Sequence, residues 1–504
     1  MANDLISRVA PHLIVGLAGT VLGDDERRLL AAAPPAGIIL FDRNIESVSQ
    51  TVRLVDEARR AAGAPLLVCA DHEGGVISVL ARAVGAPPSP AAAWFPHDEE
   101  LLAAWAAGTA RRAAACGVNL LLAPLADIDT DPDNPVIGTR AFSADPEETA
   151  MAVRTAVSAF AAEGMLTCLK HFPGHGATKA DSHLTLPVID ADRRTLAARE
   201  LVPFAAGIAA GADCVMSAHV ALRGGDRPAS LDPALLRGLL RDEMGFTGVV
   251  ITDALEMAGI LPDRLPMSSI DPRSRKEEGT GPAAVIGAAL EAGNDLLLFS
   301  RPVAEAFAEL EGAVKDGGYG QLLPERLETA AVESLARIAA LRVRAVDGTG
   351  TVADSATVER KIAGRSIRIV GDTAEALRRL PGGRPPRLVI AGPARDLAYP
   401  VVRRFAARLA DALGVEAVFA DLPMRGQAVG SRPPEAADGA AVIFVSRSVL
   451  ELSQATALAS GASVVVAAGR PAEASLAPPG VPAIATLGVY DAAADELARI
   501  LRGG

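Results

Sequence analysis

The feature that most constrains this chain is a regular alternation of short apolar runs with helix-length segments over roughly its first 300 residues. The eight runs are Leu13–Leu17, Gly37–Phe41, Leu66–Ala70, Val118–Ala123, Thr167–Leu169, Cys214–Ala218, Val249–Thr252 and Asp295–Phe299. The segments between them include Ser47–Arg60, Glu99–Ala115, Pro146–Ala162, Arg193–Ala210 and Pro282–Ala292. Strands that are apolar on both faces pair in parallel under a cover of helices. The pattern therefore predicts an α/β protein that begins with a TIM-like (β/α)8 barrel.

A second, smaller alternation follows a stretch around Asp347–Gly350 where the pattern is weak. Its apolar runs are Ile367–Val370, Leu388–Ala391, Ala417–Phe419, Val442–Val445, Val464–Ala467 and Ala483–Thr486. They predict an open-sheet α/β/α domain. We expect a catalytic barrel over residues 1–346, a linker over 347–364 and a C-terminal domain over 365–504. The second domain contains neither G-x-G-x-x-G nor a Walker-type loop, so no nucleotide cofactor is expected.

Charge and composition bear on partners and location. The chain has 49 basic and 61 acidic residues, a net charge of -12, and no basic run, so we expect no nucleic-acid partner. The N-terminus carries Asp4 and has no charged segment leading into a long apolar one, which argues against a signal peptide or membrane anchor and favours the cytoplasm. Four cysteines, none in a C-x-x-C motif, are expected to be reduced core residues: Cys69, Cys116, Cys168 and Cys214.

Polar residues follow several of the predicted barrel strands, at the ends where barrel enzymes place their active sites. They are Asp71, His72 and Glu73 after the third strand, Asp127 after the fourth, Lys170 and His171 after the fifth, His219 after the sixth and Asp253 after the seventh. Asp127, with Asp129 and Asp131, also fits an ordinary run of Asx turns, which is the interpretation we prefer. Asp253 follows a wholly apolar strand, where an acid is costly unless it is used or paired.

The segment Thr167–Pro187 gathers three of the seven histidines within thirteen positions, namely His171, His175 and His183. From the residues alone, this cluster fits a metal site, an acid/base site or a hydrogen-bonded loop. Pro173 and Gly174 interrupt any helix, which removes the i, i+4 spacing of a helical zinc motif. We therefore expect no metal.

Several motifs together resemble glycoside hydrolase family 3, in the two-domain form of its β-N-acetylglucosaminidase branch. They are Ala36-Gly-Ile-Ile-Leu-Phe-Asp-Arg-Asn-Ile45, Asp71-His-Glu-Gly-Gly75, Val136-Ile-Gly-Thr-Arg-Ala-Phe142, Lys170-His-Phe-Pro-Gly-His-Gly176, Asp181-Ser-His183 and Gly248-Val-Val-Ile-Thr-Asp-Ala-Leu-Glu-Met257. The resemblance covers the predicted barrel well. It extends to the second domain more loosely, through Val464-Val-Val-Ala-Ala-Gly-Arg-Pro471.

The resemblance implies a retaining exo-β-N-acetylhexosaminidase that acts on small soluble glycosides through a glycosyl-aspartate intermediate. Asp253 matches the nucleophile, His183 the acid/base, and Asp181 the residue that orients the imidazole. The positions that match substrate-binding residues are Asp71, Arg140, Lys170, His171, His219 and Met257. The implied partner is a carbohydrate, no cofactor is implied, and the oligomeric state stays open.

One departure from the family pattern leaves alternatives open. The family usually reads D-Q-E-G-G-R-V-x-R after the third strand, whereas this chain has Val76 and Val79 at the two arginine positions. Each lost charge-assisted hydrogen bond is worth roughly 1.5 to 3 kcal/mol. Arg82 lies three residues further along, and the polar segment Leu261–Gly281 is long for a loop after the nucleophile strand. An altered sugar specificity and a non-catalytic sugar-binding protein are therefore alternatives.

Phosphorolysis is a further alternative. A neutral histidine base does not repel an anionic acceptor as a glutamate would, so phosphate as well as water could attack the intermediate.

Overall fold

The computed structural model describes residues 2–131, 134–178, 186–225, 227–257, 260, 282–315, 326–345, 355–370, 387–392, 400–421, 441–444, 462, 464–468, 477, 481 and 483–502. The chain divides into two compact units. The first comprises Met1–His72, Ala110–Ile128 and Asp145–Val352, and the second Glu73–Thr109, Asp129–Ala144 and Ala353–Gly504. The two units are described separately.

The first unit contains an eight-stranded sheet in the order β11-β9-β7-β6-β3-β2-β1-β12, with every pairing parallel. An isolated parallel bridge between Ile251 and Leu296 links the two outer strands and nearly closes a barrel. The strands are β1 Leu13–Gly16, β2 Gly37–Leu40, β3 Leu67–Ala70, β6 Leu120–Leu121, β7 Leu166–Phe172, β9 Cys214–Ser217, β11 Val249–Thr252 and β12 Leu297–Pro302. All eight predicted strands are confirmed.

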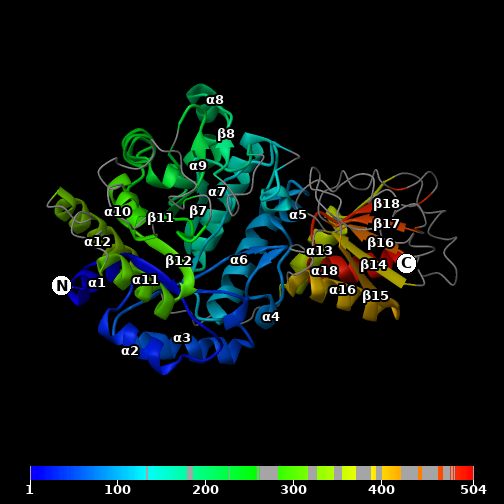
Figure 1. Ribbon diagram of the computed structural model, residues 1–504. Helices are drawn as coiled ribbons and strands as arrows, with labels where there is room; N and C mark the ends of the chain where they lie inside the picture. The colour runs from blue at the N-terminus through cyan, green and yellow to red at the C-terminus, as the bar shows by residue number, and fades with distance from the viewer. Residues whose placement is uncertain are drawn as a thin grey trace. The chain divides into compact units, whose positions relative to one another are not determined.

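Helices surround the strands of this unit (Figure 1). They are α1 Ala2–Val9, α2 Asp24–Ala32, α3 Val48–Ala62, α7 Pro146–Ala162, α8 Arg193–Ala198, α9 Leu201–Ala209, the π-helix η5 Ala234–Glu243, α10 Pro282–Ala292, α11 Val303–Lys315 and α12 Arg326–Arg344. Helix α6, Glu99–Ala115, runs through the boundary between the units. The predicted helix over Arg193–Ala210 is two helices, α8 and α9. Side chains set the helix starts, since Asp145 accepts hydrogen bonds from two backbone N–H groups at the start of α7.

Short elements complete this unit. The strands β8 Val188–Ile189 and β10 Ala221–Leu222 form a parallel pair. The 3-10 helices are η1 Ala10–His12, η2 Asp42–Asn44 and η4 Ala229–Leu231.

The barrel core is apolar and extends to α12. Ile338 and Leu341 of α12 are buried in the same cluster as Ile14, Leu67 and Val249 of the strands. Arg337 of this helix reaches Asp295, which precedes β12, and Arg344 reaches Asp213, which precedes β9. Helix α12 therefore lies across the N-terminal ends of the strands. The four cysteines are buried and unpaired, as predicted.

The second unit is built on a six-stranded sheet in the order β13-β18-β17-β16-β14-β15, in which only the β13–β18 pairing is antiparallel among the described strands. The strands are β13 Arg368–Val370, β14 Arg387–Gly392, β15 Glu416–Asp421, β16 Ala441–Phe444, β17 Val464–Ala467 and β18 Ala483–Ala485. The helices α13 Ala356–Ser366, α16 Pro400–Leu413 and α18 Asp491–Leu501 cover one face (Figure 1). The second helical layer of the predicted α/β/α domain stays a prediction.

Two segments that follow barrel strands also belong to the second unit. Within it, Ser89 donates a hydrogen bond to the carbonyl oxygen of Leu487 at 2.5 Å, and Arg365 pairs with Asp98 at 2.6 Å. These segments contain all of β4 His72–Gly74 except its first residue, together with β5 Ile77–Ser78, α4 Ala81–Val84, α5 Pro90–Trp94 and η3 Gly138–Arg140. The predicted domain boundaries stay a prediction, and much of the predicted linker lies outside the described residues.

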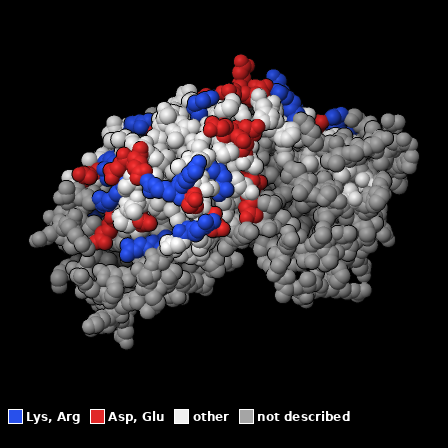
Figure 2. Space-filling model, turned by 90° about the horizontal axis from the view of Figure 1, so that it is seen from above, with Lys and Arg blue, Asp and Glu red and all other residues white. Residues whose placement is uncertain are grey.

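Charges of both signs are interspersed on the described part of the face shown in Figure 2. In the described part of the chain, no helix combines the length and apolar character that crossing a membrane requires.

Candidate active site

The C-terminal ends of parallel strands lie at one rim of a barrel, so the chain brings several predicted site residues to the same end of the first unit. Asp71 follows β3, Lys170 and His171 are among the last residues of β7, and Asp253 follows β11. His219 follows β9. The sequence prediction of a polar rim therefore holds for these five residues, while their roles stay predictions.

Lys170 and Asp71 form a close ion pair across neighbouring parts of this rim. The Lys170 ammonium nitrogen lies 2.5 Å from Oδ1 of Asp71, and the lysine side chain is 2% exposed against 25% for the aspartate. A buried ammonium is stable only with such a partner. The pair therefore presents a fixed, half-buried carboxylate that can accept hydrogen bonds from a polar ligand.

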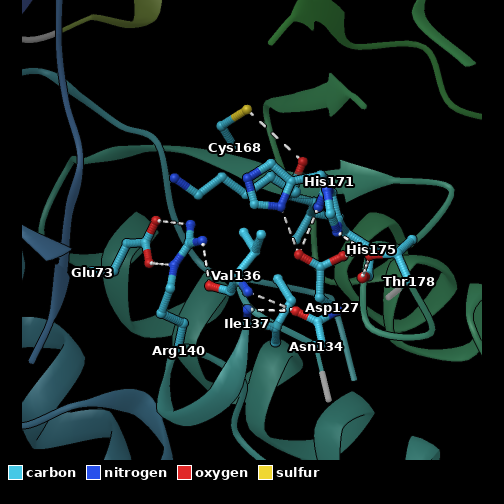
Figure 3. A network of polar contacts seen from close by, with 12 residues as sticks. Glu73, Asp127, Asn134, Val136, Ile137, Arg140, Cys168, His171, His175 and Thr178 are labelled. Carbon is cyan, nitrogen blue, oxygen red and sulfur yellow. Dashed lines mark hydrogen bonds and ion pairs between the residues drawn. The ribbon is translucent and has the colours of Figure 1, made fainter. Parts of the chain in front are cut away.

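Asp127 is a fully buried carboxylate that holds two histidines (Figure 3). Its Oδ2 accepts from the backbone N–H of His171 at 3.1 Å and lies 2.7 Å from Nδ1 of that ring, and its Oδ1 accepts from the backbone N–H of His175 at 2.7 Å. Burial alone would raise the pKa of the Asp127 carboxyl, but the facing His171 and these donors outweigh it and hold the pKa below its usual range. Asp127 is therefore not the simple turn residue that we preferred from the sequence.

His175 is held at the base of the segment that follows β7 by contacts with Thr178. The Thr178 hydroxyl donates to the His175 carbonyl oxygen at 2.9 Å and accepts from Nδ1 of the ring at 2.9 Å. Burial, followed by the neighbouring His171, lowers the pKa of His175 to about 4. A side chain at Gly176 would lie 1.6 Å from the carbonyl oxygen of Ile128. Only glycine allows this approach, so the loop base is fixed against the barrel.

Asp253 is half-buried at the end of β11. Its backbone N–H donates to the Ser217 carbonyl oxygen at 3.0 Å, and one carboxylate oxygen accepts from the Ala254 N–H at 2.8 Å. These contacts fix the carboxylate at the rim.

His219 and Met257 both hydrogen-bond to Ala254, the residue that follows Asp253. The His219 ring is fully buried, with Nδ1 2.8 Å from Oγ of Ser230 and Nε2 3.0 Å from the Ala254 carbonyl oxygen. Both ring nitrogens are thus engaged by the protein, and His219 holds the turn that carries Asp253. Met257 is 8% exposed and its backbone N–H donates to the Ala254 carbonyl oxygen at 3.1 Å.

In the second unit, Arg140 and Glu73 form a buried two-pronged ion pair (Figure 3). Nε and Nη2 of the guanidinium each donate to one carboxylate oxygen at 2.8 Å, and Nη1 donates to the Val136 carbonyl oxygen at 3.1 Å. Bidentate geometry fixes the plane of the guanidinium. Sequence reasoning assigned Arg140 to the sugar and did not foresee that Glu73 would hold it. Val76, which replaces one family arginine, is buried.

His72 is a rim residue to which sequence reasoning assigned no role. Its ring is fully buried, and neither nitrogen has a hydrogen-bond partner among the described residues. Burial, together with the nearby positive charge of Arg112, lowers the pKa of His72 to about 3, so the ring is neutral. The only signal in the sequence was histidine in place of the family's glutamine.

Asp181, predicted to orient the imidazole, and His183, predicted to transfer the proton, lie outside the described residues. The long segment 261–281 also lies outside them. Among the described residues, no three His, Cys, Asp or Glu side chains are grouped so that they could hold a metal ion.

The fold and the site together define a class of protein. A parallel barrel with polar side chains gathered at the C-terminal ends of its strands is typical of barrel enzymes. Residues 15–338 match the glycosyl hydrolase family 3 N-terminal domain. The chain belongs to this family and is a glycoside hydrolase, which confirms the resemblance seen in the sequence.

Relatives and solved structures agree with this assignment. A protein named beta-hexosaminidase from Xanthomonas euvesicatoria pv. vesicatoria is 37% identical over 309 residues, which are 60% of this chain and 87% of that protein. One of the same name from Xylella fastidiosa is 38% identical over 300 residues, 58% of this chain and 83% of the relative. A family 3 beta-N-acetylglucosaminidase from Paenibacillus sp. superposes with a TM-score of 0.75 at 28% identity, covering 99% of this chain and 96% of the other.

Proposed function

We propose that the chain is a retaining exo-β-N-acetylhexosaminidase that removes terminal N-acetylglucosamine-type residues from small soluble glycosides. The observation that carries the proposal is the carboxylate of Asp253, held at the catalytic rim by the Ala254 N–H. The names of the relatives, beta-hexosaminidase and beta-N-acetylglucosaminidase, support the choice of sugar.

The reaction would proceed in two displacements. In the first, a carboxylate oxygen of Asp253 bonds to the anomeric carbon as the glycosidic C–O bond breaks, and His183 gives its proton to the leaving oxygen. In the second, His183 takes a proton from water, whose oxygen attacks the same carbon and releases Asp253. Asp181 would orient the imidazole throughout. Two inversions at one carbon give net retention.

The remaining rim residues divide into groups that contact the sugar and groups that position others. Asp71 and Lys170 would hold sugar hydroxyls through their fixed ion pair. Because Nδ1 of His171 faces Asp127, the ring would meet the substrate with Nε2. Asp127 and His219 are assigned as positioning residues, since their polar atoms contact the protein itself. We also propose a cytoplasmic location, which four unpaired buried cysteines support.

A chromogenic aryl N-acetyl-β-glucosaminide tests the proposal. Wild type should release the aryl group, and Asp253→Asn should reduce release to near background while keeping the thermal unfolding temperature of wild type. His183→Ala should slow substrates with poor leaving groups far more than activated aryl glycosides, because only the former need a proton. Equal losses for both substrate classes would remove His183 from the acid role.

The same assay separates the alternatives. Addition of phosphate should leave the product a free sugar, whereas accumulation of a glycosyl phosphate would identify a phosphorylase. Binding of N-acetylglucosamine in calorimetry without any turnover of a panel of aryl glycosides would identify a non-catalytic sugar-binding protein.

A further inference from the structure

The outer face of α12 carries an apolar stripe with coiled-coil spacing. Val332, Ala336, Ala339 and Val343 are all exposed and follow one another at intervals of four, three and four residues. Val332 is 66% exposed and Val343 86% exposed, and Leu335 beside them is 36% exposed. Three of the seven large exposed apolar side chains of the described residues therefore fall on this one helix. Such concentration points to a contact rather than to scattered surface residues.

The opposite face of α12 fixes the direction in which the stripe points. Ile338 and Leu341 are buried in the barrel core, and Arg337 and Arg344 are tied to carboxylates that precede strands. The helix therefore cannot rotate its stripe inward without breaking these contacts. Figure 1 shows α12 at the edge of the ribbon of this unit.

A hollow of about 360 Å³ adjoins the stripe. Its lining is mainly apolar and includes one charged side chain, Arg342. The other lining residues are Pro11, Pro65, Leu335, Ile338, Ala339 and Val343. A hydrophobic side chain from a second surface could therefore bind in the hollow, and the small side chains of Ala336 and Ala339 would allow that surface to approach closely.

The stripe is complementary to itself when reversed. About a two-fold axis between residues 337 and 338, Val332 meets Val343 of a second copy, and Ala336 meets Ala339 of that copy. The same symmetry brings Glu333, at one end of the stripe, toward Arg344 at the other end of the second helix. This pairing of opposite charges at the flank of the stripe favours the antiparallel direction.

We propose that this face of α12 is the interface of a symmetric dimer of this chain, with the two α12 helices packed antiparallel. Because α12 crosses the N-terminal ends of the barrel strands, the dimer leaves the opposite, catalytic rim of each copy open. The stripe is about 17 Å long. A stable interface usually buries roughly 1,200 to 2,000 Å² in total, more than one helix pair supplies, so the walls of the hollow take part and the dimer dissociates on dilution.

Sedimentation velocity over a wide range of protein concentration tests the proposal with the full chain. Wild type should shift from monomer to dimer as concentration rises. Ala339→Glu places two like charges at the two-fold axis and should be monomeric throughout, with unchanged activity per chain and unchanged thermal unfolding. Met151→Glu, the same kind of change at an exposed apolar position of α7, should dimerise like wild type. A wild type that is monomeric throughout, or equal behaviour of the two variants, would overturn the proposal.

Cross-linking tests the direction of the helices. Chains carrying Ala336→Cys and chains carrying Ala339→Cys should form a disulfide faster when mixed and oxidised than either does alone. The four native cysteines are buried and serve as an internal background. Faster cross-linking of either variant with itself would contradict the antiparallel pair. Dimerisation that yields no disulfide on oxidation, or that persists in Ala339→Glu, would indicate contact through another surface.

Discussion

Replacing Asp127 by asparagine tests how much the buried carboxylate contributes to the site. The carboxylate accepts three hydrogen bonds, two from His171 at one oxygen and one from His175 at the other. An asparagine in the same place keeps one acceptor oxygen and replaces the other with an NH2 group. If the amide oxygen keeps the two His171 bonds, the backbone N–H of His175 faces a donor instead of an acceptor.

The expected loss follows from these contacts. A buried N–H left without a partner costs about 1 to 3 kcal/mol, and each remaining bond loses about 1 kcal/mol when its acceptor becomes neutral. We therefore expect Asp127→Asn to lower the free energy of unfolding by about 3 to 5 kcal/mol if the defect is felt by the whole unit. If the defect stays local, it should appear instead as a loss of about a hundredfold or more in kcat through displacement of His171 and the loop base.

Urea unfolding and steady-state kinetics on an aryl glycoside distinguish these outcomes. Asp190→Asn is the control, because its carboxylate pairs with Arg223 at an exposed site, where such pairs contribute about 0 to 1 kcal/mol. A variant at 127 that matched wild type in both urea midpoint and kcat would refute the reasoning.

The pH dependence gives a second check on Asp127. Its pKa in the folded chain lies below the ordinary 3.8, so its stabilising effect is present above that value and is lost as the pH falls through the folded pKa. The difference in unfolding free energy between wild type and Asp127→Asn should stay constant from neutral pH to about 4 and shrink below it. A difference that vanished near pH 6 would assign the effect to a histidine instead.

Two further predictions concern residues close to the same rim. Gly176→Ala should displace the loop base and lower kcat by at least tenfold while the barrel stays folded by circular dichroism, because the new methyl group would overlap the Ile128 carbonyl oxygen. Gly238→Ala, at an open position without a left-handed backbone, is the control for adding a methyl group. His72→Leu should make the free energy of unfolding depend less on pH in the acid range. Because the pKa of His72 is about 3 in the folded chain, wild type loses about 1.4 kcal/mol of unfolding free energy per pH unit as the pH falls below 6.5. Thermal unfolding at pH 7 and pH 5 measures it, and parallel losses in both proteins would contradict it.

Local patterns predicted the architecture well because each barrel strand is buried on both faces and is bounded by helix starts with clear signals. Three predicted helices have the observed bounds, namely α6, α7 and α10. The break between α8 and α9 was missed, although Pro203 in the first turn of α9 is a signal for a helix start. At this break Glu200 is buried and pairs with Arg199 at 2.6 Å, an arrangement that the sequence pattern does not reveal.

The contacts of the site were predicted less well than its location. The chain order of strands places Asp71, Lys170 and Asp253 at one rim, and that follows from parallel pairing alone. Which partner each side chain takes depends on residues distant in sequence. Asp127 is bound by His171, 44 positions away, and Arg140 by Glu73, 67 positions away. Nothing local distinguishes such a carboxylate from one that caps a turn.

The contacts of Asp127 also explain how a glycine-rich loop can carry chemistry that needs accurate placement. Gly174 and Gly176 give the chain freedom to turn sharply after β7, yet His175 between them is bound through its backbone N–H to Asp127 and through its ring to Thr178. The glycines therefore allow the backbone to bend sharply, and the contacts of His175 hold the bent backbone in one position. The segment that bears Asp181 and His183 begins from an anchored point only a few residues away. The same carboxylate holds His171, so the histidine that we propose to face the sugar and the start of the segment that we propose to transfer protons are both anchored by Asp127.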